Sequence, residues 1–320
     1  MTTGTVNTMR RRRFLGIAST TALLSLPSAW SAPSHAYTNL MPQFWDLYDS
    51  ALHERIQVRV ESILHGFFTP NALIYEGAGV KWSAAGIARW LKDFDPIADS
   101  VRALSLTVPA TIRAQPPRFQ ANLPEFDANA GRIYFLPSLF WFDGHRQPWR
   151  GAYPLFVGVD GIVHYHGNDC DLTVFIDHEL LHVFHAQRNP AMLLDESPPI
   201  FIDLWTERLA VYASRILNPA ADRLHILLDD QPLAAATADA VTYAAGELLK
   251  CLDSTDSKDE QRFFSTGYVG DLPARSGYLV GWKVAERVGR SMSLTALASL
   301  NQSAVRERVA HELAAIAEGR

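Results

Sequence analysis

The sequence predicts an α+β protein in which a small sheet precedes a mostly helical second half. Apolar residues recur at helical spacing from Pro42 to Phe67, which predicts one long amphipathic helix. Short candidate strands, separated by glycine, proline and aspartate, occur between residues 107 and 168. From residue 169 onward the apolar segments again have helical length and spacing. We therefore expect one domain over residues 37–320, helical over 37–106, β-rich over 107–168 and helical over 169–320.

The first two parts of this domain contain helices and then strands. Two more helices are expected, from Ser83 to Phe94 and from Pro96 to Leu104. The expected strands, which would form a small, mainly antiparallel or mixed sheet, are Arg118–Asn122, Arg132–Leu136, Tyr153–Val159 and Ile162–Tyr165. A turn at Asp160-Gly161 would join the last two. His164 and His166 would then face one side of a strand, where they either line a cleft or form an ordinary polar face.

The last part contains a series of helices. A helix is expected from Ile200 to Leu217, with Ser197 as its N-cap and Pro198 at its first position. Asn218-Pro219 would end it. Later helices are expected over Pro219–Leu228, Ala235–Leu252, Gln261–Phe264, Arg275–Val288 and Ser303–Ala317.

The N-terminus resembles an export signal. Four arginines, Arg10 to Arg13, precede Phe14-Leu15, a short apolar run follows, and Ser34-His35-Ala36 is typical of a cleavage site. Paired arginines followed by x-Phe-Leu are typical of a bacterial twin-arginine signal, although a general secretory signal with four arginines fits as well. Residues 1–36 are therefore expected to be a signal peptide, and the mature protein to be periplasmic or secreted.

The charge and the cysteines limit the partners. Removing residues 1–36 takes away four arginines and no acids, so the formal net charge falls from -5 to about -9. This balance argues against a nucleic-acid partner, and no later stretch approaches the length of a membrane-spanning helix. Cys170 and Cys251 either pair in an oxidising compartment or are two buried thiols. The sequence does not indicate an oligomeric state.

The segment from Cys170 to His185 contains the strongest functional pattern. His178-Glu179-Leu180-Leu181-His182 matches H-E-x-x-H. On a helix, residues four apart lie on one face, so His178 and His182 can both direct imidazole nitrogens at one metal ion. Glu179 is rotated away from this face and can reach a water on that metal as a general base. Zinc accepts imidazole ligands and keeps one position open in a catalytic site.

A third protein ligand is needed to complete such a zinc site. Glu207 is the preferred candidate, because it lies in an otherwise apolar helix next to small residues, and two histidines with one glutamate form an established catalytic set. Glu196, in the preceding loop, and His185, on the same face as the two histidines, are the alternatives. Arg188 stands where the longer H-E-x-x-H-x-x-G-x-x-H pattern needs histidine, which excludes that class.

These residues together resemble the gluzincin metallopeptidases. In that family H-E-x-x-H is followed by a glutamate on the next helix, often within W-x-E-G-x-A-x-Y, and this chain has Trp205 to Tyr212 in that pattern with Arg208 in place of glycine. Gly277-Tyr278-x-x-Gly281 is similar to a helix in the predicted zinc-dependent proteases of unknown substrate. The resemblance covers about residues 164–300 and implies a thermolysin-like zincin fold.

The resemblance also implies a donor for the oxyanion that forms during hydrolysis, since related peptidases use a tyrosine or a histidine for this role. Tyr278 is the candidate here, followed by Arg275 and Tyr268. The expected function is an exported zinc metallopeptidase that holds one zinc ion and acts on a peptide or protein. The alternatives are a zincin-fold binding module without catalysis and a zinc amidase that acts on cell-wall peptides. The intact Glu179 favours an enzyme.

Overall fold

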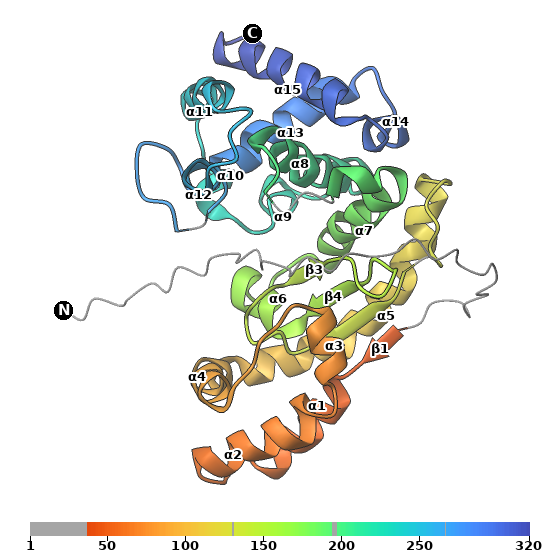
Figure 1. Ribbon diagram of the computed structural model, residues 1–320, viewed down its shortest axis with the longest axis vertical. Coiled ribbons are helices and arrows are strands. Elements are labelled where there is room, and N and C mark those ends of the chain that lie inside the picture. The colour runs from red at the N-terminus through yellow and green to blue at the C-terminus, as the bar shows by residue number, and fades with distance from the viewer. Residues whose placement is uncertain (1–36, 130, 194–196, 266) are drawn as a thin grey trace, which may run out of the picture. The chain divides into compact units, whose positions relative to one another are not determined.

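The computed structural model describes residues 37–129, 131–193, 197–265 and 267–320, and the expected signal peptide lies outside these ranges (Figure 1). The protein is α+β, as expected, with one small mixed sheet and a majority of helices. The described chain divides into two compact units. We call residues 37–105 and 128–164 the sheet unit, and residues 106–127 and 165–320 the helical unit.

The sheet unit contains four short strands, β1 Tyr37–Asn39, β2 Ile133–Leu136, β3 Gly144–Arg146 and β4 Leu155–Gly158. Their order is β1-β2-β4-β3, with β1, β2 and β4 parallel and β3 antiparallel to β4. β2 and β4 pair with Ile133 opposite Leu155, and every residue of β4 is buried. The sheet is therefore mixed, with three parallel strands and the antiparallel β3 at one edge.

The helices of the sheet unit share an aromatic core. They are α1 Met41–Ser50, α2 Ile56–Ile63, α3 Ala72–Gly77, α4 Ala84–Phe94 and α6 Val159–His166, with a π-helical turn at Leu64–Phe68 and a 3-10 turn at Asp95–Ile97. Phe44 lies at the centre of this core, with its ring 5.6 Å from that of Phe67 and 5.5 Å from that of Phe94. Such edge-on ring pairs add to the free energy gained from burial alone.

A buried carboxylate orders the turn between β2 and β3. Asp160, at the start of α6, is fully buried and accepts hydrogen bonds from the backbone N–H groups of Ser138 and Phe140 and from Nε1 of Trp90. Phe140 has a left-handed backbone with φ of 58°, a conformation that costs energy in a residue other than glycine. The Asp160 hydrogen bonds hold this turn in place.

Three expectations for the first half are wrong. The long helix expected from Pro42 to Phe67 is divided into α1, α2 and the π-helical turn. Residues 118–122, expected as a strand, end the helix α5 Ala98–Asn122, which contains three prolines and which the two units share. Residues 162–165, also expected as a strand, lie in α6, because Asp160-Gly161 begins a helix rather than a hairpin turn. His164 and His166 are therefore not on a strand.

The helical unit is built around three packed helices, α7 Leu172–Arg188, α8 Ile200–Leu217 and α13 Ser276–Gly289 (Figure 1). α8 packs against both of the others, and α11 Ala238–Lys250 packs against α15 Gln302–Ala317. The shorter elements are the 3-10 turn Pro190–Leu193 and the helices α9 Arg223–Ile226, α10 Gln231–Ala234, α12 Ser257–Phe264 and α14 Leu294–Ala298. α8 has the expected bounds, Ile200 to Leu217, but its N-cap is Pro199, so the N-cap expected at Ser197 and the first position expected at Pro198 are wrong.

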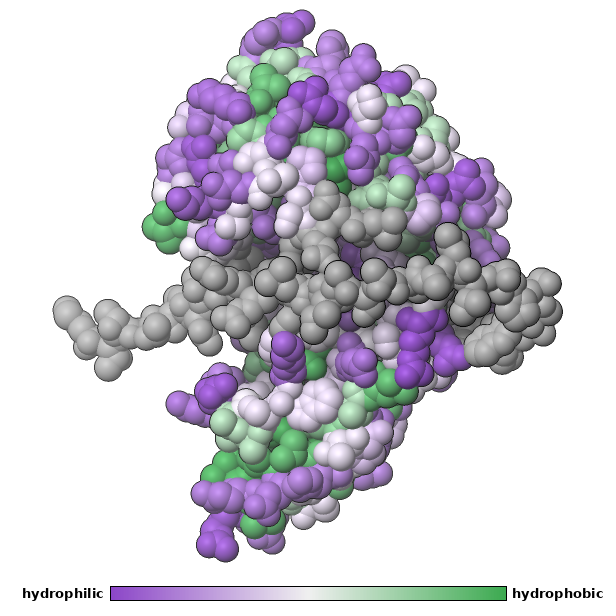
Figure 2. All heavy atoms as spheres, viewed as in Figure 1, coloured by the Kyte–Doolittle hydropathy of each residue, from purple (hydrophilic) through white to green (hydrophobic). Residues whose placement is uncertain are grey.

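The surface of the helical unit is polar over α15, at the top of Figure 2, where Arg306, Glu307 and Arg308 are exposed. In the sheet unit some apolar side chains reach the surface, including Leu52, Ile56 and Leu73. Among the described residues, none of the helices combines the length and the apolar character needed to cross a membrane.

Candidate metal centre

The helix α7 is buried nearly all round. Asp171 caps its N-terminus, accepting hydrogen bonds from the backbone N–H groups of Thr173 and Val174. Every residue from Val174 to Ala186 is buried, including one aspartate, one glutamate and three histidines. Because polar side chains are costly to bury without partners, each of these five side chains indicates a specific interaction.

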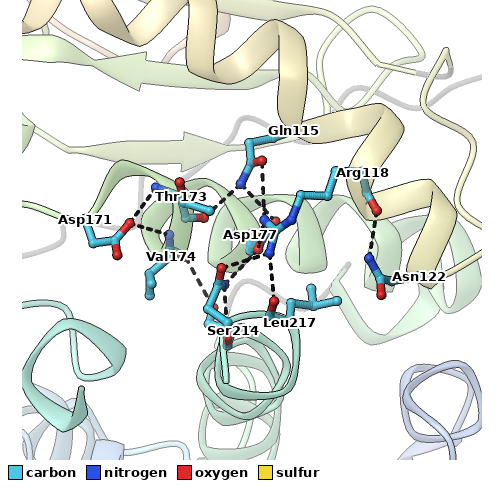
Figure 3. Close-up of polar contacts among 10 residues, drawn as sticks. Gln115, Arg118, Asn122, Asp171, Thr173, Val174, Asp177, Ser214 and Leu217 are labelled. Carbon is cyan, nitrogen blue, oxygen red and sulfur yellow. Dashed lines mark hydrogen bonds and ion pairs between the residues drawn. The ribbon is translucent and has the colours of Figure 1, made fainter. Parts of the chain in front are cut away.

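Asp177 ties α7 to its two neighbours (Figure 3). Its carboxylate accepts hydrogen bonds from Nη1 of Arg118 at 2.8 Å, from the side-chain amide of Asn218 at 2.8 Å and from that of Gln115 at 3.3 Å. Burial raises the pKa of Asp177, while the hydrogen bond from Asn218 and the charge of Arg118 oppose this shift. Arg118 also donates to the carbonyl oxygen of Leu217, at the end of α8. This network fixes the rotation of α7 one residue before His178.

Two histidines of α7 and one glutamate of α8 converge. The Nε2 atoms of His178 and His182 are 3.1 Å apart. The carboxylate of Glu207 lies 3.9 Å from Nε2 of His178 and 3.7 Å from Nε2 of His182. The two imidazoles are almost fully buried, and the Glu207 side chain is 18% exposed. The expected third ligand therefore lies beside the two histidines.

These distances fit one zinc ion. Zinc–nitrogen and zinc–oxygen bonds of about 2.0–2.1 Å place the ligand atoms of a tetrahedral site roughly 3.3 Å apart. The two Nε2 atoms are 3.1 Å apart, Oε2 of Glu207 is 3.9 Å from Nε2 of His178, and Oε1 of Glu207 is 3.7 Å from Nε2 of His182. Imidazole nitrogens and a carboxylate are ligands that zinc accepts, so these three side chains could hold a divalent cation.

Glu179 lies at the edge of the same group. One side-chain oxygen of Glu179 and one ring nitrogen each from His178 and His182 lie within 4.8 Å of one another. The residue is 5% exposed, and its neighbours on α7 are buried. A carboxylate in this position can accept a proton from a water molecule held beside the histidines.

The alternative ligands are placed differently. His185 is fully buried on α7. Among the described residues, the ligand atoms that all lie within 4.8 Å of one another belong to His178, Glu179 and His182, and this set includes neither His185 nor Glu207. Glu207 is kept as a candidate because its two oxygens lie 3.9 Å and 3.7 Å from the two histidine nitrogens. Glu196 lies outside the residues that the structure describes. Cys170 and Cys251, both described, do not form a disulfide. Glu207 remains the preferred third ligand.

Arg208 stands where the W-x-E-G-x-A-x-Y pattern has glycine, and its side chain is fully buried. Its guanidinium carbon lies 3.0 Å from the centre of the Tyr278 ring. Burial lowers the pKa of Arg208 to about 10, although the charges of Tyr278 and Glu207 oppose this. Gly281 provides the space, because a Cβ atom there would lie 1.9 Å from Cγ of Arg208.

The three candidate oxyanion donors have different surroundings. Tyr278 is buried, with the guanidinium groups of Arg208 and Arg275 over its ring. Arg275 also forms an ion pair of 2.9 Å with Asp230. Tyr268 donates a hydrogen bond to an exposed carboxylate, that of Asp271. Of the three candidates, Tyr278 is the one whose ring contacts Arg208, the residue that follows Glu207.

Sequence reasoning missed the anchoring residues of α7. Arg118 was expected on a strand, and Asp177 and Asn218 were given no role, although Asn218 was expected to end a helix. An aspartate on the apolar side of a helix, next to the first metal-binding histidine, was a usable signal, because a buried acid requires a donor. Its partners are 41 to 62 residues away in the chain, and no local pattern identifies them.

Comparison with known proteins adds no family to this description. No family model, no curated protein and no solved structure matches the chain.

Proposed function

We propose that the protein is an exported zinc-dependent metallopeptidase. The observation that supports this most directly is the convergence of His178, His182 and Glu207 from two packed helices, with Glu179 beside them. A thermolysin-like zincin fold is part of the proposal. It is supported by the small mixed sheet, the two helices that carry the candidate ligands and the helical second half.

Each residue has a role in the proposed reaction. His178, His182 and Glu207 would hold the zinc ion, which when bound supplies a water of lowered pKa and a polarised scissile carbonyl. Glu179 accepts the proton of the attacking water and then donates it to the leaving nitrogen. Tyr278 is proposed to stabilise the oxyanion, supported by its location on α13, which packs against α8.

The test uses the mature chain, residues 37–320, loaded with zinc. We expect hydrolysis of casein by the wild type and a loss of about 10²–10⁴-fold in Glu179→Gln, because general-base catalysis contributes that much. Zinc content should stay the same in both proteins, since Glu179 is not a proposed ligand. Glu307→Gln, an exposed site on α15, is the matched control and should retain full activity.

Other outcomes would contradict the proposal in distinguishable ways. Hydrolysis of peptidoglycan but not of casein would identify an amidase that acts on cell-wall peptides. Zinc binding without hydrolysis of either substrate would identify a binding module. Equal activities of the wild type and Glu179→Gln would remove Glu179 from the mechanism.

A further inference from the structure

A second group of metal-binding side chains lies elsewhere in the helical unit. His166 is the last residue of α6, Cys170 lies in the connection to α7, and Asp229 follows α9. One ligand atom from each of the three lies within 4.8 Å of the others. Nδ1 of His166 is 3.5 Å from the carboxylate of Asp229, and these side chains are 4% and 14% exposed. The group is therefore largely shielded from water.

A fourth candidate ligand lies next to this group. Nε2 of His225 is 3.9 Å from the carboxylate of Asp229, and Nδ1 of the same ring is 3.1 Å from that of Asp222. Metal-binding histidines usually direct their second ring nitrogen at a carboxylate or a carbonyl, which fixes the tautomer. In His166 the nitrogen beside the carbonyl oxygen of Leu228, at 3.0 Å, is Nδ1, which is also the atom 3.5 Å from Asp229, so under this rule its Nε2 would be the ligand atom.

The spacing of the four residues is regular. His166 and Cys170 are four positions apart, and so are His225 and Asp229. Two short segments would thus each supply two ligands, as in many structural zinc sites, whose ligand pairs are separated by two to five residues. The ligand atoms of His166, Cys170 and Asp229 lie within 4.8 Å of one another, whereas His225 is outside this set and approaches only Asp229, so its ring would have to move closer to complete the site.

We propose that His166, Cys170, His225 and Asp229 form a second, structural metal site that prefers zinc. A thiolate with imidazoles favours zinc over magnesium or calcium, which prefer oxygen ligands. Four protein ligands leave no open position for substrate, which is typical of structural rather than catalytic zinc. The ion would tie the segment before α7 to the connection between α9 and α10.

Cobalt substitution of the mature chain tests this site. The apoprotein is kept reduced with a phosphine and titrated with Co²⁺, and the thiolate-to-cobalt charge-transfer absorption in the near ultraviolet is recorded. We expect this absorption in the wild type and its loss in Cys170→Ser. Cys251→Ser is the matched control and should retain it, because the Cys251 sulfur lies 3.5 Å from the carbonyl oxygen of Glu247 in its own helix.

The same measurement separates this site from the candidate metal centre. A His178→Ala/His182→Ala variant should lose one metal ion per chain and retain the thiolate absorption, because no cysteine belongs to the first site. Asp229→Asn, which keeps the side-chain volume, should weaken Co²⁺ binding at the thiolate site by at least tenfold. Circular dichroism confirms that each variant is folded.

Three results would overturn the proposal. The first is a wild type without the thiolate absorption at saturating Co²⁺. The second is an absorption that survives Cys170→Ser or disappears in Cys251→Ser. The third is an Asp229→Asn variant that is folded and binds Co²⁺ at the thiolate site as tightly as the wild type does.

Discussion

Two buried polar groups, one in each unit, differ in what surrounds them. Asp160 of the sheet unit faces N–H donors, the backbone groups of Ser138 and Phe140 and the indole of Trp90. His178, His182 and Glu207 of the helical unit face one another, within 3.1 to 3.9 Å. An acceptor that is surrounded by donors is complete and stabilises a turn. A set of converging nitrogen and oxygen atoms is the arrangement that a metal ion could complete, and this is why we propose a metal site there and only a structural role for Asp160.

The largest effect that this comparison predicts is the loss of zinc in His182→Ala. Removing one of three protein ligands should lower zinc affinity by more than the roughly 10–100-fold that loss of an outer partner costs. Hydrolysis should be lost with it. Metal analysis after dialysis measures the affinity, and His311→Ala, at an exposed histidine on α15, is the control. Full zinc content in His182→Ala would show that the converging lone pairs do not bind a metal.

Asp160→Ala tests the structural network of the sheet unit and should lower stability without affecting zinc. The substitution leaves three buried N–H groups without their acceptor, and we expect the free energy of unfolding to fall by about 3 kcal/mol or more. Zinc content per folded molecule should not change. Chemical denaturation measures the loss, and Asp46→Ala, at an exposed site on α1, should stay within about 0.5 kcal/mol of the wild type. A loss of zinc from folded Asp160→Ala would contradict the assignment of Asp160 to structure alone.

Arg208→Met sharpens the comparison from within the helical unit. Arg208 is fully buried against the ring of Tyr278, and burial lowers its pKa to about 10, so its charge is costly to desolvate. We expect the methionine variant to be about 1–2 kcal/mol more stable, because a flexible apolar side chain of similar length fills the same space. The matched substitution Arg308→Met, at the surface of α15, should have little effect. A destabilised Arg208→Met would show that the cation has a partner that compensates for its burial.

The smallest predicted effect is on the acid stability of the sheet unit. Burial would raise the pKa of Asp95, but hydrogen bonds from Arg59 and Tyr48 outweigh it and lower the pKa below 3.8. A lowered pKa stabilises the folded state above the unfolded value, and this contribution is lost as pH falls through the folded value. Asp95 is about one-third exposed, so the contribution should be under about 1 kcal/mol. Unfolding of the wild type and Asp95→Asn between pH 5 and pH 2 should show the two stabilities converging at the acid end.

The sequence predicted the candidate metal centre better than the sheet. Four-residue spacing on a helix is a local property, so the convergence of His178 and His182 could be read directly, and an acid in the middle of the next, largely apolar helix indicated Glu207. The sheet depends on partners far apart in the chain. Asp160 accepts from residues 20 to 70 positions away, which turns an apparent hairpin signal into the first turn of a helix.

Prolines misled the prediction for α5. Proline usually ends a helix, because it lacks an N–H group and its ring clashes with the preceding turn. α5 nevertheless continues through Pro109, Pro116 and Pro117, and the apolar side chains of Ile112 and Phe119 beside them are fully buried. Burial and the ion pair of Arg118 with Asp177 are tertiary effects, and here they outweigh the tendency of proline to end a helix. A sequence pattern shows the proline but not the tertiary contacts.

The contact between Gly281 and Arg208 makes the substitutions allowed at one position depend on the residue at the other. The Arg208 side chain occupies the space that a side chain at position 281 would need. Any route by which position 281 acquires a side chain must first shorten position 208, so the order of the two changes is fixed. With glycine placed at position 208, an alanine at position 281 would still meet Cδ1 of Leu204 at 2.9 Å, so the Leu204 side chain would also have to shift.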